Sequence, residues 1–517
     1  MKVAFRVDSS FLIGSGHVMR CLTLADELRS QGIDTFFICR EQKGHLGELI
    51  MDRGYPLFVL SQPQTTSETG WTENRGQYQT WIDVSDTIDA QQTLEVLKKK
   101  RTCDWMVVDH YALTSAWHRR IKSFGSKIMV IDDLADRQYD CDLLLDQTFF
   151  RNKTDYQGLI SEKAQLLLGT EYALLRPDFY SLREKALTKR SSFEGVKHVL
   201  ISMGGVNTLD ITKNILAGLE TIPNIKYIVF DVVMGRKGEA YEEMKKYASS
   251  SSLNINVFAY VKNMADSMLQ ADLAIGTAGS SSWERCCLGL PALLISVADN
   301  QSFLVENLAK SGAIIQIQGK NEILSKNIAK AFETIIGDVK RIKKMSQVAF
   351  EMCDGMGTKR TVDAMTSSSG LFIRKANVKD TQLIYEWQSA PSTRKYCRNP
   401  QIPSLSEYKK WMKDVISDLN RELMVLTASE GPVGLVRMDK LDSGVADYEI
   451  SILISPEQYQ KGYGKKALSL ARDEWPDYRL FAEIHKENIA SIKLFQSSGY
   501  KQLTETLFVN EPKNVHN

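Results

Sequence analysis

Apolar runs alternate with amphipathic stretches over the first 155 residues of the chain. The stretches between the runs, such as His17–Ser30 and Thr87–Lys99, have helical spacing. The runs themselves have the length and composition of buried strands, at Val3–Val7, Thr35–Cys39, Trp105–Val108, Lys127–Ile131 and Asp142–Leu145. This order predicts a parallel sheet that is covered by helices on both faces.

The same alternation begins again near residue 198 and continues to about residue 364. Strands are expected at His198–Met203, Tyr227–Val233, Ile255–Phe258, Leu273–Ile275 and Ala292–Ile295. Two consecutive doubly wound units predict an α/β fold with two Rossmann-like lobes, 1–155 and 156–364. Their ligands are expected beyond the carboxyl ends of the strands, in a cleft between the lobes.

Residues 365–370 interrupt this pattern. Their sequence, Met-Thr-Ser-Ser-Ser-Gly, is small and polar, which predicts a linker. From residue 371 to about residue 510, the pattern of apolar and polar residues becomes that of an α+β domain. Its clearest strands are expected at Leu423–Thr427, Val433–Met438 and Tyr448–Ile454.

Composition and charge exclude several classes of function. A net charge of +2 over 517 residues gives no basic field for nucleic acid. No apolar run approaches the ~20 residues that cross a membrane. Arg6 and Asp8 stand where a signal peptide would be apolar, so we expect a buried first strand and a cytoplasmic protein. The eight cysteines form no Cys-x-x-Cys pair and have no histidine cluster beside them, which favours reduced thiols and no metal site.

The turn Gly14-Ser15-Gly16-His17 joins the first expected strand to the next helix. Glycines at such a turn let the backbone approach a ligand, and a helix N-terminus attracts an anion or a polarised water. This position also favours the neutral imidazole of His17, which can accept a proton from water. On these residues alone, His17 could equally be a hydrogen-bonding residue at the helix start without a chemical role.

A second turn, Gly279-Ser280-Ser281, follows the expected strand Leu273–Ile275. Its backbone N–H groups and hydroxyls would suit a phosphate. Glu284, one helical turn later, could accept both hydroxyls of a ribose. The turn at Gly204-Gly205 would face the same cleft. The alternative is an ordinary serine cap with a solvated glutamate.

Taken together, six separated segments resemble a known family, the UDP-2,4-diacetamido-2,4,6-trideoxy-β-L-altropyranose hydrolases of bacterial pseudaminic acid biosynthesis. The segments are Phe5–Ser10, Ile13–Leu22, Glu171–Pro177, Met203–Gly205, Gly279–Glu284 and Gly355–Arg360. The resemblance implies a glycosyltransferase-B shape that needs no metal and uses water as the acceptor. It also implies that His17 is the catalytic residue that positions or deprotonates this water.

The expected substrate and UDP site follows from these turns and this resemblance. Its members are Asp8, Gly14, Gly16, Arg20, Gly204, Gly205, Gly279, Ser280, Ser281, Glu284 and Asn300. Asp109-His110 and Asp132-Asp133 stand at expected strand ends and could also line the cleft. An aspartate in that position is, however, more often a turn-former than a catalyst.

A third glycine-containing turn lies between Gln458 and Lys465. Its glycines could wrap a pyrophosphate at a helix start. With Asn488 and Gly499 further on, residues 371–505 resemble the GNAT superfamily of N-acetyltransferases. This resemblance implies that acetyl-CoA is the co-substrate, with its pantetheine arm on the strand at 452–454 and its pyrophosphate on the turn. The implied acetyl-CoA site is Ile452, Ile454, Gln460, Gly462, Gly464, Lys465 and Asn488.

Two positions depart from the GNAT pattern. Tyr459 replaces the usual Gln or Arg three residues before the first glycine, although glutamines flank it. Phe495 replaces a tyrosine that protonates the leaving thiolate in many members, so another residue or water would supply that proton. Glu449 is the expected catalytic base, and Asp447 is a second candidate.

The start of this domain is similar to acetyltransferases that act on amino-sugar nucleotides. The similarity is carried by Trp387, Arg394 and the stretch Tyr408–Trp411, although core packing explains the tryptophans equally well.

The order of motifs predicts a bifunctional enzyme, because an N-acetyltransferase precedes the hydrolase in pseudaminic acid synthesis. The expected reactions are acetylation of UDP-4-amino-4,6-dideoxy-N-acetyl-β-L-altrosamine, followed by hydrolytic removal of UDP. Two alternatives remain, a glycosyltransferase with a sugar or lipid acceptor and a non-catalytic sugar-nucleotide-binding protein. A third alternative keeps both activities but changes the substrate to another diamino sugar nucleotide.

Overall fold

The chain divides into two compact units, Met1–Val362 and Asp363–Asn517. The side chains of residues 299–303 are not described. The computed structural model otherwise describes residues 1–61, 78, 81–204, 208–235, 237–296, 299–319, 321–366, 371–418, 420–428, 431–441 and 447–512.

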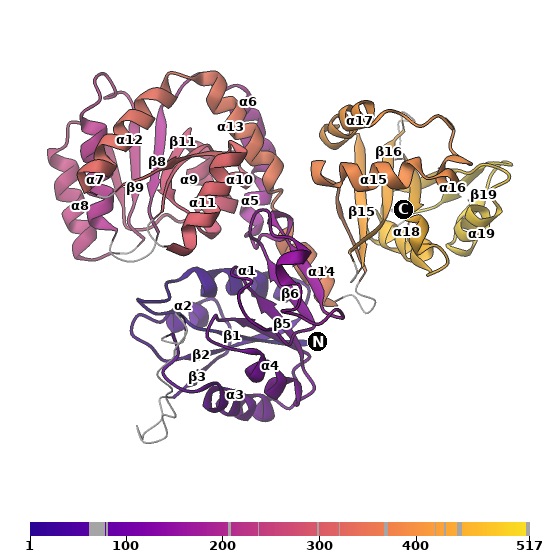
Figure 1. Cartoon of the computed structure of the whole chain (residues 1–517), viewed down its shortest axis with the longest axis horizontal. Coiled ribbons are helices and arrows are strands. Elements are labelled where there is room, and N and C mark those ends of the chain that lie inside the picture. The colour runs from indigo at the N-terminus through magenta and orange to yellow at the C-terminus, as the bar shows by residue number, and fades with distance from the viewer. Residues whose placement is uncertain are drawn as a thin grey trace. The chain divides into compact units, whose positions relative to one another are not determined.

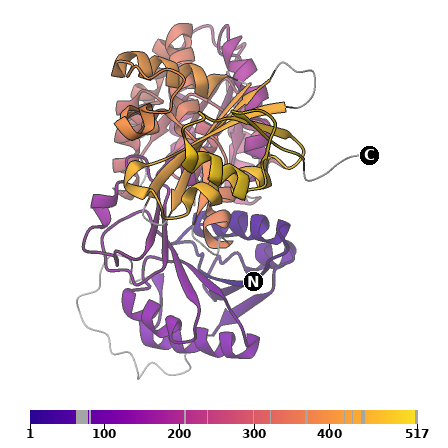
Figure 2. The same cartoon turned by 90° about the vertical axis from the view of Figure 1, so that its right-hand side faces the viewer.

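The first sheet of the larger unit is parallel, with strand order β3-β2-β1-β4-β5-β6-β7. Its strands are β1 Lys2–Val7, β2 Asp34–Arg40, β3 Leu57–Leu60, β4 Trp105–Asp109, β5 Lys127–Ile131, β6 Leu143–Asp146 and β7 Gln165–Leu168. Helices cover both faces (Figures 1 and 2), namely α1 Gly16–Ser30, α2 Gly47–Asp52, α3 Asp86–Lys100 and α4 Ser115–Lys122. The strand order reverses between β1 and β4, and ligands of such sheets bind at the carboxyl end of this reversal.

The second sheet is also parallel, in the order β10-β9-β8-β11-β12-β13. Its strands are β8 His198–Ser202, β9 Val229–Val233, β10 Asn254–Phe258, β11 Leu273–Thr277, β12 Ala292–Ile295 and β13 Ile314–Ile317. Figure 1 shows α7, α8 and α12 on one face and α9, α10 and α11 on the other. These helices are α7 Leu209–Glu220, α8 Glu239–Ser250, α9 Met264–Gln270, α10 Ser280–Cys287, α11 Asp299–Ser311 and α12 Asn321–Ile336. Here the strand order reverses between β8 and β11.

The last helix of this region returns to the segment that follows β7. The connecting helices are α5 Pro177–Ser181, α6 Arg183–Ser191, α13 Val339–Met352 and α14 Gly357–Thr366. Thr358 Oγ1 donates to the carbonyl of Leu175 at 2.8 Å, and Arg360 Nη1 donates to the carbonyl of Glu171 at 2.6 Å. These bonds fix α14 onto backbone that lies almost 190 residues earlier in the chain.

The smaller unit contains a mixed sheet in the order β14-β15-β16-β17-β18-β20-β19. Adjacent strands are antiparallel except β17 and β18, which are parallel. The strands are β14 Phe372–Lys375, β15 Arg421–Ala428, β16 Gly431–Lys440, β17 Asp447–Ile454, β18 Arg479–Glu483, β19 Lys501–Gln502 and β20 Leu507–Asn510. The helices are α15 Thr381–Ser389, α16 Pro391–Arg394, α17 Leu405–Ser417, α18 Tyr463–Glu474 and α19 Ile489–Ser497.

Alternating side chains on these strands build a separate core on each face of the sheet. Val436 and Ile450 pack with α18 and α19 on one face. Leu435 and Leu453 pack with α15 and α17 on the other. Arg437 and Asp439 of β16 and Glu449 and Ser451 of β17 alternate in step with Leu435 and Leu453, so they lie on the α15–α17 face.

The predicted fold class is confirmed, with two Rossmann-like lobes followed by a mixed-sheet domain. One detail differs, because β7 pairs with β6 and carries the first sheet on to Leu168, beyond the expected limit at residue 155. The four-residue strands β3, β7 and β13 were not predicted. Over the described ranges, no helix combines the length and the apolar character that a membrane span requires.

Candidate functional site

The loop between β1 and α1 brings His17 to the carboxyl edge of the first sheet. The loop closes through a hydrogen bond from Gly14 N to Ser10 O at 2.8 Å. Gly14 has φ +83°, in the left-handed region that favours glycine. His17 follows in the first turn of α1, with 8% of its surface exposed. It lies next to the reversal in strand order, because β1 and β4 are adjacent there.

Asp109, the last residue of β4, fixes the orientation of His17. One carboxylate oxygen lies 2.6 Å from His17 Nδ1, and Arg20 donates to both oxygens, from Nε at 2.6 Å and from Nη2 at 2.7 Å. Burial alone would raise the pKa of Asp109, but Arg20 and His17 hold it well below its usual range. An ionised Asp109 only accepts hydrogen bonds, so Nδ1 of His17 carries a proton, and Nε2 is the nitrogen that holds the lone pair in the neutral tautomer.

A second layer of contacts holds this group in place. Arg20 also donates to Asp133 at 2.7 Å, and the hydroxyl of Tyr111 donates to the same carboxylate at 2.6 Å. The rings of Tyr111 and Trp81 meet His17 edge-on, with centroids at 4.9 and 5.4 Å. In the described part of the chain, Nε2 of His17 has no hydrogen-bond partner. The arrangement resembles an oriented general base, in which a carboxylate fixes the tautomer and leaves the other nitrogen to accept a proton.

The second lobe places two glycine turns at its own reversal in strand order. Gly204 follows β8 and Gly279 follows β11, and Thr277 Oγ1 donates to Met203 O at 2.7 Å between the two strand ends. Gly279 has φ +148°, and among the described residues no atom comes within 4 Å of the place where its Cβ would lie. The backbone at the start of α10 is therefore open to a ligand, as a phosphate-binding turn requires.

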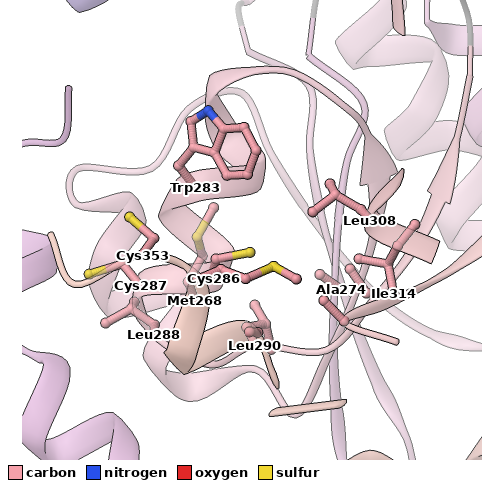
Figure 3. Close-up of a cluster of buried hydrophobic side chains, with 14 of the residues drawn as sticks. Met268, Ala274, Trp283, Cys286, Cys287, Leu288, Leu290, Leu308, Ile314 and Cys353 are labelled. Carbon is pink, nitrogen blue, oxygen red and sulfur yellow. The ribbon is translucent and has the colours of Figure 1, made fainter. Parts of the chain in front are cut away.

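The core beneath α10 fixes the direction of Glu284. Figure 3 shows Trp283, Cys286 and Cys287 directed into a cluster of buried side chains, which anchors one face of the helix. Glu284, on the neighbouring position, is half-buried and lies 3.7 Å from Arg176. Burial raises the pKa of Glu284, although Arg176 and Arg285 oppose the rise. A half-buried carboxyl group next to an open backbone turn is suited to binding hydroxyl groups.

In the smaller unit, β17 and β18 pair over only three residues. The register joins Asp447, Tyr448 and Glu449 to β18, and β17 then continues to Ile454 without that neighbour. On its other side β17 stays paired with β16. One edge of the backbone at 450–454 is therefore free of sheet partners in the described ranges, and it can bond an extended ligand.

The helix α18 begins directly after β17 and a short turn. Gly462 caps it with φ +80°, and no described atom lies within 4 Å of the place where its Cβ would be. Gln460 also has a positive φ, of 65°. Free amides at a helix N-terminus favour an anion such as a pyrophosphate. The free edge of β17 and this turn are the two places where the sequence predicts the acetyl-CoA site.

Comparison with known families identifies two regions of the chain. Residues 371–501 match the acetyltransferase (GNAT) domain, and residues 192–366 match the glycosyltransferase family 28 C-terminal domain. The chain joins these two domains. The GNAT domain supports N-acetyltransferase chemistry with acetyl-CoA as the co-substrate.

Relatives extend the similarity over the whole chain. An uncharacterized protein of Methanocaldococcus jannaschii is 23% identical over 97% of both chains. The UDP-2,4-diacetamido-2,4,6-trideoxy-beta-L-altropyranose hydrolase of Campylobacter jejuni is 28% identical over 60% of this chain and 97% of its own length. The crystal structure of MurG from Acinetobacter baumannii superimposes with a TM-score of 0.50 at 16% identity, over 70% of this chain and 99% of MurG. This last likeness shows a glycosyltransferase-B fold for the two lobes.

Two residues expected to contact substrate have structural partners instead. Asp8 is fully buried, and both of its oxygens accept hydrogen bonds from Arg6 at 2.6 and 2.9 Å. Arg40 N donates to it as well, at 2.7 Å. Arg20 is 6% exposed and its guanidinium group is occupied by Asp109 and Asp133. The structure therefore gives Asp8 and Arg20 structural partners, and their expected contact with substrate stays a prediction.

Three members of the expected nucleotide site remain at the open edge of the second sheet, namely Gly204, Gly279 and Ser280. Ser281 lies half-buried in the first turn of α10. Gly205 and the side chain of Asn300 lie outside the described residues.

The candidate bases of the GNAT domain have different surroundings. Asp447 is buried and accepts two hydrogen bonds from Arg479, at 3.1 and 2.7 Å, which leaves it as a structural residue. Glu449 is half-buried, and Arg398 donates to it at 2.6 Å. Asn488 caps α19 by accepting from Ser491 N at 3.1 Å, so only its amide nitrogen is left to face a ligand. Phe495 packs in the core against Tyr500.

Asp109 is the residue of the candidate site that sequence reasoning undervalued. Its position at a strand end was noted, but its partner lies on α1, 92 residues earlier. Within the described ranges, no group of three His, Cys, Asp or Glu side chains is arranged to hold a metal ion.

Proposed function

We propose that this protein acetylates the 4-amino group of UDP-4-amino-4,6-dideoxy-N-acetyl-β-L-altrosamine and then hydrolyses the diacetylated product to UDP and free sugar. The observation that carries the hydrolase half is the contact of 2.6 Å between the Asp109 carboxylate and Nδ1 of His17, because it leaves Nε2 as the proton acceptor. The match to the Campylobacter jejuni hydrolase along almost its whole length supports this substrate class.

In the hydrolytic step, His17 Nε2 takes a proton from water while the water oxygen attacks the anomeric carbon. The C–O bond to UDP breaks, and the diphosphate leaves as a stable anion. Asp109 stabilises the imidazolium that forms, since its carboxylate lies 2.6 Å from Nδ1. The turns at Gly204 and Gly279 and the carboxyl of Glu284 hold the nucleotide.

In the acetyl-transfer step, Glu449 accepts a proton from the 4-amino group of the sugar. A C–N bond forms, the thioester C–S bond breaks, and the thiolate takes up a proton. The free backbone edge at 450–454 orients the pantetheine arm, and the Gln460–Lys465 turn holds the pyrophosphate. Phe495 is apolar, so water or another group protonates the thiolate.

A coupled assay tests both halves. Full-length protein is incubated with the UDP-linked 4-amino sugar, with and without acetyl-CoA, and UDP and CoA are quantified. UDP is expected only when acetyl-CoA is present, and His17→Ala is expected to stop at the acetylated UDP-sugar. His198→Ala is the matched control, because His198 is exposed at the start of β8. If wild type consumes acetyl-CoA and releases no UDP, the hydrolase assignment is wrong and a glycosyltransferase with a sugar or lipid acceptor becomes the better hypothesis.

A further inference from the structure

The loop that follows α16 contacts the chain on both sides of the place where β17 and β18 separate. In the described ranges, these two strands pair as far as Glu449 and Phe481 and no further. Arg398 Nη2 donates to Oε1 of Glu449 at 2.6 Å, at the end of this pairing. Tyr396 contacts the ring of His485, which follows the end of β18, and the ring centroids are 5.8 Å apart. The loop is therefore attached to β17 through Arg398 and to the β18 side through Tyr396.

Hydrogen bonds within the loop give it a defined shape. Arg394 Nη1 donates to the carbonyl of Asn399 at 3.1 Å, and Cys397 N donates to the carbonyl of Arg394 at 3.1 Å. The side chain of Arg398 nevertheless remains 68% exposed. An ion pair of such exposure adds little to the stability of a fold. The contact of Arg398 therefore acts mainly on the carboxylate that it binds.

The charges around Glu449 make this cation important for the carboxylate. Asp439 of β16 lies directly opposite Glu449 in the sheet, and two carboxylates in such a pair repel each other. Asp439 has cations of its own, Arg437 at 2.8 Å and Arg421 at 3.6 Å. Among the described residues, Arg398 is the one cation within ion-pair distance of Glu449. Arg398 therefore opposes the repulsion that Asp439 exerts on Glu449.

The two oxygens of Glu449 are not equivalent. Oε1 accepts the hydrogen bond from Arg398, whereas no residue of the described ranges donates to Oε2. A carboxylate that is held by one oxygen has a fixed orientation, and its other oxygen stays available to a ligand. Glu449 is also the last residue of β17 that pairs with β18, so the free backbone edge begins at the next residue.

From these contacts we infer that Arg398 is a positioning residue for acetyl transfer, which holds Oε1 of Glu449 so that Oε2 receives the proton of the acceptor amine. Tyr396 supports it by fixing the same loop to the β18 side. The amine loses this proton to Oε2 as the C–N bond forms, and the guanidinium group of Arg398 keeps its own protons throughout. This inference rests on the proposed function, in which Glu449 is the base, and adds the residue that orients this base.

The first test measures CoA release by full-length protein from acetyl-CoA and the UDP-linked 4-amino sugar. Arg398→Gln is expected to lower kcat about tenfold, because a charged hydrogen bond to the base is lost, and to leave KM for acetyl-CoA unchanged. Arg398→Lys is expected to restore most of the loss, since a single hydrogen bond does not require the planar fork of arginine. Lys375→Gln is the matched control, because it removes an exposed cation that is paired with a glutamate, Glu422, at 3.1 Å.

A double-mutant cycle separates positioning from a merely structural role. If Arg398 acts through Glu449, then Glu449→Gln and Glu449→Gln/Arg398→Gln are expected to have the same kcat within about twofold, whereas independent losses would multiply. Tyr396→Ala is expected to lower kcat several-fold, and this effect is likewise expected to disappear in the Glu449→Gln protein. Multiplied losses, or a normal kcat in Arg398→Gln, would overturn the inference.

Crystal structures of the full-length protein with CoA test the orientation of Glu449 without an acceptor. Wild type is expected to show one Glu449 conformer on Arg398, and Arg398→Gln several. The same single conformer in both proteins contradicts the inference, whatever the acceptor is. If wild type releases no CoA with the UDP-linked 4-amino sugar, the proposed acceptor is wrong, and these structures still decide the role of Arg398. If Glu449→Gln keeps a normal kcat, Glu449 is not the base, and the inference fails together with that part of the mechanism.

Discussion

At the residue scale, one buried carboxylate organises the first site. Asp109 is 1% exposed and accepts hydrogen bonds from His17 and Arg20, so its charge is balanced without water. Arg20 in turn is held by Asp133. A buried carboxylate of this kind is stable only while its partners remain, because an unpaired buried charge is strongly unfavourable. The same group therefore serves both the orientation of His17 and the local structure.

Replacing Asp109 by asparagine tests this dual role. Asp109→Asn keeps the shape but removes the charge that fixes the Nδ1–H tautomer, so we expect kcat for UDP release to fall about a hundredfold or more. Acetyl transfer by the same chain is expected to be unchanged, and it reports whether the protein is intact. Asp52→Asn, at an exposed position of α2, is the matched control. A variant with nearly normal UDP release would show that Asp109 does not orient the base.

At the element scale, α14 depends on a glycine that leaves no room for a side chain. A Cβ on Gly357 would lie 2.3 Å from the carbonyl oxygen of Ala173 and 2.4 Å from the carbonyl carbon of Tyr172. The hydrogen bonds from Thr358 and Arg360 to the same segment hold the helix at this distance. The close approach explains why the first residue of α14 is glycine although glycine is a poor helix former.

Gly357→Ala is therefore expected to lower the stability of the larger unit by about 2–3 kcal/mol, because backbone atoms cannot move aside as a side chain can. Gly337→Ala is the comparison, since no described atom lies within 4 Å of its Cβ position, and a change within about 1 kcal/mol is expected. Scanning calorimetry measures both, with the transition of the smaller unit as an internal reference. Equal effects of the two substitutions would contradict the packing argument.

The elements differ in how far the sequence determines them. β1, β8 and β17 were predicted because each has a strong apolar run. The turns at Gly14 and Gly279 were predicted because the glycines that form them stand next to apolar runs in the sequence. The strand β7 has only four residues, and its place depends on pairing with β6, which no local pattern encodes. The pairing of Asp109 with His17 and the burial of Asp8 likewise depend on contacts between distant segments, so sequence alone could name these residues without assigning their roles.

At the scale of the whole molecule, the two units have separate hydrophobic cores. Over the described residues, three hydrophobic clusters pack around the first two sheets and reach as far as Cys353, and two clusters of the mixed sheet begin at Leu371. Each core is large enough for a domain of ordinary size, which is the condition for folding independently. The protein of Methanocaldococcus jannaschii aligns along both units, so the combination of the two is not peculiar to this chain.

This separation predicts that the two activities survive when the units are produced as separate chains, residues 1–366 and 371–517. The first chain is expected to release UDP from the acetylated UDP-sugar at a rate within about twofold of the full protein, and the second to acetylate the UDP-linked amine equally well, because each keeps its own core and site. Mixing the two with acetyl-CoA is expected to restore UDP release from the 4-amino sugar. Calorimetry of each chain is expected to reproduce one transition of the full protein. If the smaller chain is unfolded alone although the full protein is stable, its core depends on the larger unit, and the proposed independence of the two activities is wrong.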